Sequence, residues 1–222
     1  MVCASNISFS FNNKVIFDDA SLNIKSDSIT AIYSPSGSGK STFAKILTGC
    51  YKLNSGTITL DESVIAKPNY YNRKLGLPIQ MVYQNPSISF DPAYKLISSI
   101  TELIRYHKIC EKEDEKALIN YYLKLLNLDE SILNHKSFQL SGGEAQRIAL
   151  VKALILKPKL LILDEATSML DVSVQANVMA LAIKSVKKIK GSILVITHDK
   201  ELATTISNEI YTIENYKFVR IK

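Results

Sequence analysis

Cysteine is scarce in this sequence, and long apolar runs are missing from it. The three cysteines, Cys3, Cys50 and Cys110, are widely spaced and form no Cys-x-x-Cys pair. An odd, scattered set favours reduced structural thiols in a cytosolic compartment over a disulfide framework. No run approaches the length of about 18 uncharged apolar residues that a membrane span needs. The best candidate, Ile148–Leu156, is interrupted by Lys152. We therefore expect any membrane association to come through a partner.

Signals for export and for a repetitive architecture are also missing. The first residues, Met1–Asn6, contain no basic region followed by an apolar stretch, so we expect no signal peptide. The chain shows no internal repeat, low-complexity tract or linker. Its 222 residues are enough for one sizeable core, with or without a subdomain, and few for two independent domains. We therefore expect a single domain.

Positive charge exceeds negative charge. Lysine and arginine number 27 against 21 aspartate and glutamate residues, a difference of 27 − 21 = 6. This balance suits an anionic partner such as a nucleotide, a phospholipid surface or nucleic acid, and it favours none of them over the others. We interpret one lysine cluster as the solvated face of a helix in preference to a binding patch. Its members are Lys184, Lys187, Lys188 and Lys190.

Hydrophobic patterning predicts an alternation of strands and helices. Period-two alternation predicts strands at 7–11, 22–24 and 58–60. Short apolar runs predict buried strands at Ile29–Tyr33, Ile79–Tyr83, Leu160–Leu163 and Ile193–Thr197. Helical spacing predicts helices within 43–47, 94–128, 144–155 and 172–190, and a hairpin at 210–221. A helix between two wholly apolar strands indicates a parallel crossover, so the expected fold class is α/β.

A turn rich in serine and glycine follows the predicted strand Ile29–Tyr33 and precedes a predicted helix. It reads Ser34, Pro35, Ser36, Gly37, Ser38, Gly39, Lys40, Ser41 and Thr42. Successive small residues allow several backbone N–H groups to point into one concavity, and the helix N-terminus adds its dipole. Lys40 can reach the β- and γ-phosphates, Ser41 can ligate Mg²⁺, and Thr42 offers a further hydroxyl. The segment therefore predicts a phosphate-binding loop.

The loop departs from the usual pattern at its first position, where Ser34 stands for glycine. Glycine supplies backbone freedom at such a turn. Serine is the next smallest polar residue, so we expect the replacement to be tolerated. A serine-rich loop that contains Gly-Lys-Ser by chance is the alternative for this motif alone, and the motifs that follow argue against it.

Two carboxylates stand at the end of the predicted strand Leu160–Leu163. Open α/β sheets bind ligands beyond the carboxyl ends of their strands. Asp164 is positioned to hold Mg²⁺, and Glu165 is the candidate general base that polarises the attacking water. A strand that simply ends in solvated acids is the alternative interpretation.

Residues Leu140–Arg147 read Leu-Ser-Gly-Gly-Glu-Ala-Gln-Arg. Ser141, followed three residues later by Glu144, forms a capping box at the start of a helix. Gly142 and Gly143 permit close approach, so the same helix N-terminus is an anion site. The Leu-Ser-Gly-Gly-Glu run lies between the phosphate-binding loop and the acidic pair, and it resembles the signature motif of ABC-type ATPases.

The resemblance implies roles for four further positions. Gln84 matches the family's Q-loop, which senses the γ-phosphate and Mg²⁺. His198 matches the switch histidine, which contacts the γ-phosphate. Asp171 falls in the D-loop and is expected to face the dimer seam. Phe11 lies where the family places an aromatic residue that stacks on adenine, with an ordinary core aromatic as an equal alternative.

The resemblance covers essentially the whole chain and implies the fold of that family. This is a P-loop NTPase (RecA-like) core with an antiparallel β subdomain and an inserted α-helical subdomain. The expected ATP-binding core with its β subdomain is 1–85 and 153–222, and the expected helical subdomain with the signature is 86–152. In the family, the signature contacts the nucleotide held by the opposite subunit, so we expect two subunits to close on ATP and Mg²⁺.

Finer resemblance favours an import ATPase. The segment Met81–Pro86, followed by Ser89–Pro92, is similar to the Q-loop region of the oligopeptide, dipeptide and nickel uptake subfamily. Leu170–Ala176 points the same way. The chain resembles the shorter, second ATPase subunit of that subfamily. The expected cargo is a transition metal such as nickel, free or chelated, or short peptides.

The same resemblance implies the partners. They are a second ABC ATPase subunit (a paralogue or another copy of this chain), two transmembrane permease subunits and, indirectly, an extracellular solute-binding protein, with no nucleic acid. We expect a peripheral location on the cytoplasmic face of the cell membrane, with 86–96 as the surface that meets the permease. The alternative is a soluble ABC-type ATPase that acts as a regulatory or nucleic-acid-associated module.

Overall fold

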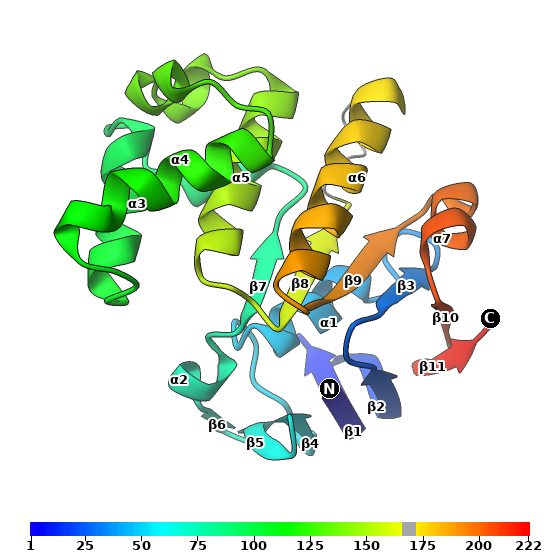
Figure 1. Ribbon diagram of the computed structural model, residues 1–222. Coiled ribbons are helices and arrows are strands. Elements are labelled where there is room, and N and C mark those ends of the chain that lie inside the picture. The colour runs from blue at the N-terminus through cyan, green and yellow to red at the C-terminus, as the bar shows by residue number, and fades with distance from the viewer. Residues whose placement is uncertain (166–171) are drawn as a thin grey trace. The chain divides into compact units, whose positions relative to one another are not determined.

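The computed structural model describes residues 1–165 and 172–222, which form two units (Figure 1). The first, called here the sheet unit, comprises Met1–Met81, Pro158–Glu165 and Lys190–Lys222. The second, the helical unit, comprises Val82–Lys157 together with helix α6 (Val172–Lys188). This grouping divides the chain near 81/82 and 157/158, whereas the expected division is at 85/86 and 152/153, and it also places α6 with the helical unit. The functional assignment of subdomains stays a prediction.

An antiparallel sheet of five strands forms one half of the sheet unit. Its order is β2-β1-β4-β5-β6. The strands are β1 (Val2–Phe11), β2 (Lys14–Ile24), β4 (Ser55–Leu60), β5 (Ser63–Lys67) and β6 (Tyr70–Tyr71). The three strands predicted from period-two alternation are therefore confirmed. β5 and β6 were not predicted, because in these short strands only Ile65 and Ala66 are buried.

A second sheet has the order β11-β10-β3-β9-β8-β7. Its strands are β3 (Ile29–Tyr33), β7 (Ile79–Val82), β8 (Leu160–Asp164), β9 (Ser192–Thr197), β10 (Glu209–Glu214) and β11 (Lys217–Arg220). β8, β9, β3 and β10 pair in parallel, and β10 and β11 form the predicted antiparallel hairpin. Every residue of β8 and β9 is buried, which confirms the expectation drawn from their wholly apolar runs. These strands and their helices make an α/β fold.

Three helices belong to the sheet unit: α1 (Lys40–Leu47), α2 (Arg73–Gly76) and α7 (Lys200–Ile206). α1 buries Phe43, Ile46 and Leu47, as its spacing predicts, and the chain turns away at Gly49 with φ 76°. α7 was not predicted. It is only seven residues long, and its start is marked by Asp199, whose carboxylate accepts a hydrogen bond from the Leu202 N–H at 3.0 Å.

The core of the sheet unit is shared by its two sheets. Apolar side chains from both sheets and from α1 form one cluster, which includes Ile7, Phe17, Ile58, Ile32, Ile162, Leu194 and Phe43. The rings of Phe17 and Phe43 lie 6.0 Å apart, and both contact Phe218 of β11. Burial of both faces accounts for the apolar interiors of β8 and β9, whose polar residues lie only at the strand ends.

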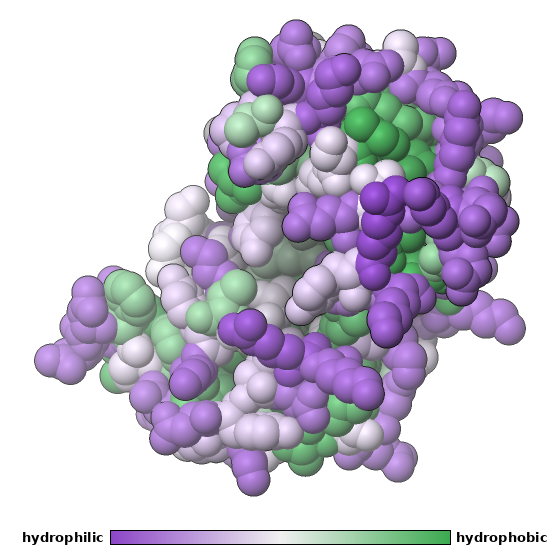
Figure 2. All heavy atoms as spheres, turned by 90° about the vertical axis from the view of Figure 1, so that its left-hand side faces the viewer, coloured by the Kyte–Doolittle hydropathy of each residue, from purple (hydrophilic) through white to green (hydrophobic). Residues whose placement is uncertain are grey.

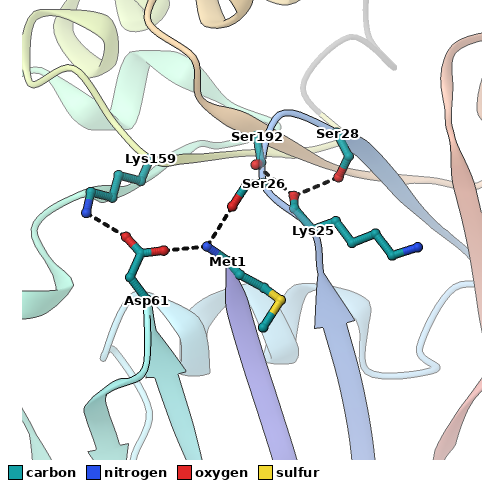
Figure 3. A network of polar contacts seen from close by, with 7 residues as sticks. All are labelled: Met1, Lys25, Ser26, Ser28, Asp61, Lys159 and Ser192. Carbon is teal, nitrogen blue, oxygen red and sulfur yellow. Dashed lines mark hydrogen bonds and ion pairs between the residues drawn. The ribbon is translucent and has the colours of Figure 1, made fainter.

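A polar network at one end of this core joins the two sheets (Figure 3). Asp61, after β4, accepts hydrogen bonds from the Met1 amino group and from Lys159 Nζ at 2.6 Å, and Lys159 precedes β8. The Lys25 carbonyl, after β2, accepts from Ser28 Oγ at 2.7 Å and from Ser192 Oγ of β9 at 2.9 Å. Segments distant in sequence are thereby held together at this edge.

The helical unit contains four longer helices and four short 3₁₀ segments. The helices are α3 (Leu96–Tyr106), α4 (Glu115–Leu125), α5 (Gly142–Ile155) and α6 (Val172–Lys188). The 3₁₀ segments are η1 (Pro86–Ser89), η2 (Lys112–Asp114), η3 (Glu130–Asn134) and η4 (Ser137–Gln139). These confirm the helices predicted within 94–128, 144–155 and 172–190. The four lysines of the cluster near the end of α6 are exposed, as expected of a solvated face.

Charged groups join α3 to α4. Arg105 donates two hydrogen bonds to the nearly buried Glu115 carboxylate, at 2.7 and 2.8 Å. A cavity of about 390 Å³ lies beside this pair, with Ile97, Ile119 and Leu133 among its lining residues. Figure 2 views the molecule from this side and shows hydrophobic side chains recessed between hydrophilic ones. Among the described helices, none has both the length and the apolar character to cross a membrane.

We predict that Phe43→Ala lowers the free energy of unfolding by about 3–5 kcal/mol, because it leaves a cavity where a fully buried ring packed. Chemical denaturation of the purified chain measures this. The matched control is Phe138→Ala, since the Phe138 ring is 70% exposed and its removal should change stability by less than about 0.5 kcal/mol. Equal effects of the two substitutions would contradict the packing described.

Candidate functional site

Three parallel strands of the sheet unit end side by side, and polar residues follow each of them. β3 pairs with β9 so that Tyr33 lies opposite Thr197, and β8 pairs with β9 so that Asp164 lies opposite Ile196. The next residues after these strands are Ser34, His198 and Glu165. The register therefore gathers the phosphate-binding loop, the acidic pair and the histidine at one edge of the sheet, which is where α/β sheets bind ligands.

The loop between β3 and α1 requires glycine at two positions. Gly37 has φ 81° and Gly39 has φ 105°, in the left-handed region that favours glycine. A Cβ atom at Gly39 would also lie 2.7 Å from Cγ2 of Ile16. α1 begins directly afterwards, and the Phe43 N–H donates to the Gly39 carbonyl at 2.9 Å. The loop thus delivers the N-terminus of α1 to the site, which is the geometry that binds phosphate.

Lys40 lies at the start of α1 and is 4% exposed. Its ammonium donates hydrogen bonds to the Ser34 and Pro35 carbonyls, at 2.6 and 2.9 Å. Burial lowers the pKa of Lys40, and the charges of Glu165 and Asp164 oppose that shift. The cation is thus held within the loop, at a place where phosphate oxygens would be natural partners.

Ser41 and Asp164 lie against each other. The Ser41 hydroxyl donates a hydrogen bond to Asp164 Oδ1 at 3.0 Å, and Asp164 is only 6% exposed. Burial is the largest cause of a raised pKa at Asp164, and the hydrogen bond from Ser41 opposes it. A hydroxyl and a carboxylate are hard oxygen ligands. The pair therefore suits a divalent cation that would offset the desolvation of the carboxylate.

The loop also contains a buried hydroxyl, that of Ser38. Ser38 Oγ finds no hydrogen-bond partner among the described residues. A buried hydroxyl without a partner is costly, so a ligand oxygen that paired with it would be favoured. Together with Lys40, this points to an oxygen-rich anion in the loop.

Glu165 and His198 face each other across β8 and β9. Glu165 Oε1 lies 3.6 Å from His198 Nδ1, and the Glu165 and His198 side chains are 18% and 59% exposed. The Glu165 backbone has φ 46°, and its N–H donates to the Ile196 carbonyl at 2.9 Å. A left-handed backbone at a glutamate is strained and typical of functional positions. A carboxylate and an imidazole thus lie together at the edge of the sheet where the phosphate-binding loop follows β3.

Ser34, which replaces the first glycine of the pattern, is almost fully buried and bonded to β10. Its Oγ accepts a hydrogen bond from the Ile213 N–H at 3.2 Å and lies 3.3 Å from Thr212 Oγ1. Its backbone is not in the left-handed region. Nothing in the backbone therefore requires glycine at this position. The hydroxyl also extends the pairing of β3 with β10 beyond the last residue of β3.

Phe11 ends β1 and is 52% exposed, so it is not the core aromatic that sequence reasoning kept as the alternative. Its ring lies 5.9 Å from that of Tyr51, which also stacks on Phe9 at 5.4 Å. Lys45 Nζ lies 5.6 Å from the centre of the Tyr51 ring. An exposed aromatic surface is compatible with a stacked base, and the role of Phe11 toward adenine stays a prediction.

The remaining expected site residues belong to the helical unit. Gln84 is exposed in a bend just after β7. Ser141 caps α5 as predicted: its N–H and Oγ donate to the Glu144 carboxylate at 2.9 and 2.7 Å, and these bonds lower the pKa of Glu144. Gly142 is exposed beside this cap, and Gly143 is partly exposed. Asp171 lies outside the described residues.

Two supporting contributions escaped sequence reasoning. Thr212 and Ile213 hold Ser34 from β10, which lies about 180 residues away and becomes a neighbour only through parallel pairing. The charge of Lys45, one helical turn after Ser41 in α1, lowers the pKa of Asp164. The four-residue spacing from Ser41 to Lys45 could have indicated that Lys45 lies near the site. No local signal links β10 to the loop.

We predict that Ser34→Gly lowers the free energy of unfolding by about 1–3 kcal/mol, because it leaves the Ile213 N–H without its side-chain acceptor. Thermal or chemical unfolding measures the change. Ser36→Gly is the matched control, since Ser36 is exposed in the same loop. A gain in stability for Ser34→Gly would show that the hydroxyl contributes nothing there.

The sequence and the fold both match known proteins. Residues 17–168 match the ABC transporter family. The chain is 35% identical to the nickel import ATP-binding protein NikE of Escherichia coli over 214 residues, which cover 94% of this chain and 80% of that protein. It is also 35% identical to the protein of the same name from Shigella dysenteriae over 208 residues, covering 93% and 78%.

Solved structures share the fold. CbiO1 of Clostridium perfringens, part of the ABC transporter complex cbiONQ, superposes with a TM-score of 0.83 at 24% identity, covering 98% of this chain and 86% of that one. A dimeric ATP-binding cassette, MJ0796, bound to ADP and Pi, gives a TM-score of 0.82 at 24% identity, covering 100% and 99%. The predicted P-loop NTPase fold of an ABC cassette is confirmed. The chain therefore belongs to the ABC transporter family, as one of its ATP-binding subunits, which are ATPases coupled to transmembrane solute transport.

Proposed function

We propose that this subunit powers the import of a transition metal, with nickel, free or chelated, as the first candidate and short peptides as the second. The observation that carries the proposal is the 35% identity to nickel import ATP-binding proteins over more than nine tenths of the chain. The nucleotide-binding residues do not identify the solute, so the cargo proposal rests on that relationship alone.

Two ATP molecules would lie between two such subunits, each between the phosphate-binding loop of one and the signature of the other. The exposed N-terminus of α5 supports this role for Ser141, Gly142, Gly143 and Glu144, because a helix N-terminus favours an anion. The second subunit would be a paralogue or another copy of this chain. Asp171 would face the seam between the two.

Mg²⁺ fits the oxygen ligands of the sheet unit. Ser41 and Asp164 would hold the ion together with phosphate oxygens, and Gln84 is expected to contribute from its loop. The described residues contain no cluster of three or more histidine, cysteine or acidic side chains that could hold a metal by themselves, which fits an ion that shares its ligands with the nucleotide. When bound, the ion neutralises charge on the β- and γ-phosphates.

Hydrolysis would use the pair that the strands bring together. The Glu165 carboxylate accepts a proton from water as the water oxygen attacks the γ-phosphorus, and the bond from that phosphorus to the ADP oxygen breaks. His198 contacts the γ-phosphate and orders the site. Lys40 and the loop amides stabilise the charge on the phosphate oxygens.

The membrane partners would be two permease subunits, with an extracellular solute-binding protein acting through them, and the subunit would sit at the cytoplasmic face of the membrane. The candidate docking surface is 86–96. It carries two exposed apolar side chains, Ile88 at 65% and Tyr94 at 61%. Exposed apolar groups gathered on one segment are typical of an interaction site.

We predict that Glu165→Gln lowers steady-state ATPase activity about 100-fold or more while ATP still binds and holds two subunits closed, because the amide cannot accept the proton. Phosphate release and size-exclusion chromatography with ATP measure the two effects. Glu62→Gln, at an exposed turn of the sheet unit, is the matched control and should keep its activity. Full activity in Glu165→Gln would remove the role assigned to Glu165.

The cargo is tested by uptake in cells whose only copy of this chain is Glu165→Gln. We expect loss of radiolabelled nickel uptake, measured with and without a chelating ligand, and normal uptake of a labelled tripeptide run in parallel. The opposite pattern would make the chain a peptide permease subunit. Cells with Glu62→Gln control for expression, and unchanged uptake of both solutes in the Glu165→Gln cells would contradict the import function.

A further inference from the structure

Lys152 lies inside the helical unit and reaches from α5 to the segment that follows the Q-loop. Its ammonium donates a hydrogen bond to the Ser89 carbonyl at 2.6 Å, and Ser89 is the last residue of η1. It also donates to Ser99 Oγ of α3 at 3.4 Å and lies 4.9 Å from the centre of the buried Phe90 ring. One side chain thus holds together α5, α3 and η1.

The partners of this cation are unusual for a lysine. Among the described residues, no carboxylate lies within ion-pair distance of Lys152, and its charge is matched by a carbonyl, a hydroxyl and an aromatic face. Burial lowers the pKa of Lys152, and the charge of the exposed Glu102 opposes that shift. Burying an ammonium costs free energy unless it keeps its hydrogen bonds and its contact with the aromatic ring. Motion that separated η1 from α5 would break these contacts, so we expect the two segments to move together.

The two ends of this connection carry different functions. α5 begins at the signature cap Ser141, and Lys152 lies eleven residues beyond it (152 − 141), roughly three helical turns. η1 lies within 86–96 and carries the exposed Ile88. A continuous helix is rigid over this length, so a displacement of η1 would be passed along α5 to its N-terminus.

We propose that Lys152 is a positioning residue that couples the permease-docking segment to the signature helix. The inference rests on the proposed function, in which 86–96 meets the permease and the signature closes on ATP. A push on η1 moves Lys152 through the Ser89 carbonyl, and α5 carries the motion to Ser141. Loss of the ammonium uncouples the two without touching the nucleotide-binding residues.

The first test needs only the purified chain. Lys152→Met keeps most of the apolar length of the side chain and removes its donors. Hydrogen exchange should be faster in the variant at the Ile88 and Phe90 amides, which donate to the Asn85 and Ser87 carbonyls. Lys152→Arg, which keeps the charge, should restore protection. Unchanged exchange in Lys152→Met would overturn the proposed connection.

The second test uses the chain assembled with its permease subunits in proteoliposomes. The ratio of ATPase activity with permease to that of the subunits alone should fall about fivefold or more in Lys152→Met, a change typical of lost coupling between sites. Basal activity should stay unchanged, and Lys152→Arg should recover the ratio. Lys124→Met, an exposed lysine of α4, is the matched control.

Three results are informative about the two proposals separately. A wild-type ratio of one would contradict the permease role of 86–96, while the exchange experiment would still test the connection itself. A wild-type ratio above one that Lys152→Met preserves would overturn the coupling role alone. If Lys152→Met fails to fold, Phe90→Leu can replace it, because it removes only the aromatic ring beneath the ammonium. This variant should speed hydrogen exchange in η1 and lower the ATPase ratio. No change in either quantity would overturn the proposal.

Discussion

Parallel pairing of β3, β9 and β8 is the constraint on which the nucleotide site depends. The chemistry-bearing residues follow these strands directly, so their distances are set by strand register and not by loop length. The register is held because β8 and β9 are buried on both faces, where a slip by one residue would misplace every side chain. Glu165 shows the tightness of the arrangement, since it keeps a left-handed backbone to bond with the Ile196 carbonyl.

The buried polar groups around the loop find only some of their hydrogen-bond partners within the described part of the chain. Lys40 is satisfied by two carbonyls of its own loop, Asp164 by the Ser41 hydroxyl, and Ser38 Oγ by no group among the described residues. Burial shifts the pKa of both Lys40 and Asp164 toward the neutral form. In the proposed function, a nucleotide phosphate and its cation would supply the missing opposite charges, and a site of this kind would then favour its ligand over water.

The helical unit is organised around α5 in a different way. Its N-terminus is exposed and capped by Ser141 and Glu144, whereas its middle is buried and holds Lys152 against η1. A helix with an exposed N-terminus and a buried middle suits the proposed role, in which α5 receives motion at Lys152 and transmits it to Ser141. The ATP-binding subunits of transporters face this requirement, because the chemistry and the solute pathway lie in different proteins.

Much of the site could be predicted from sequence because its motifs are local. The loop Ser34–Thr42, the acidic pair and the capping box each lie within one short segment, so spacing alone indicates their chemistry. The strands and helices with strong periodicity were predicted for the same reason. α7, β5 and β6 were missed because they are too short for a period to show, and the grouping of α6 with the helical unit depends on contacts that no local pattern records.

The sequence by itself therefore determined the family and its ATPase activity, and it predicted the residues that carry the chemistry, since these lie in short motifs with fixed spacing. Tertiary structure alone decided which distant groups support them. Ser34 meets Ile213 and Thr212 only through the pairing of β3 with β10, and Lys152 meets Ser89 only through the packing of α5 on η1. Such contacts depend on how strands and helices pack across more than sixty residues of chain, and no local spacing encodes that.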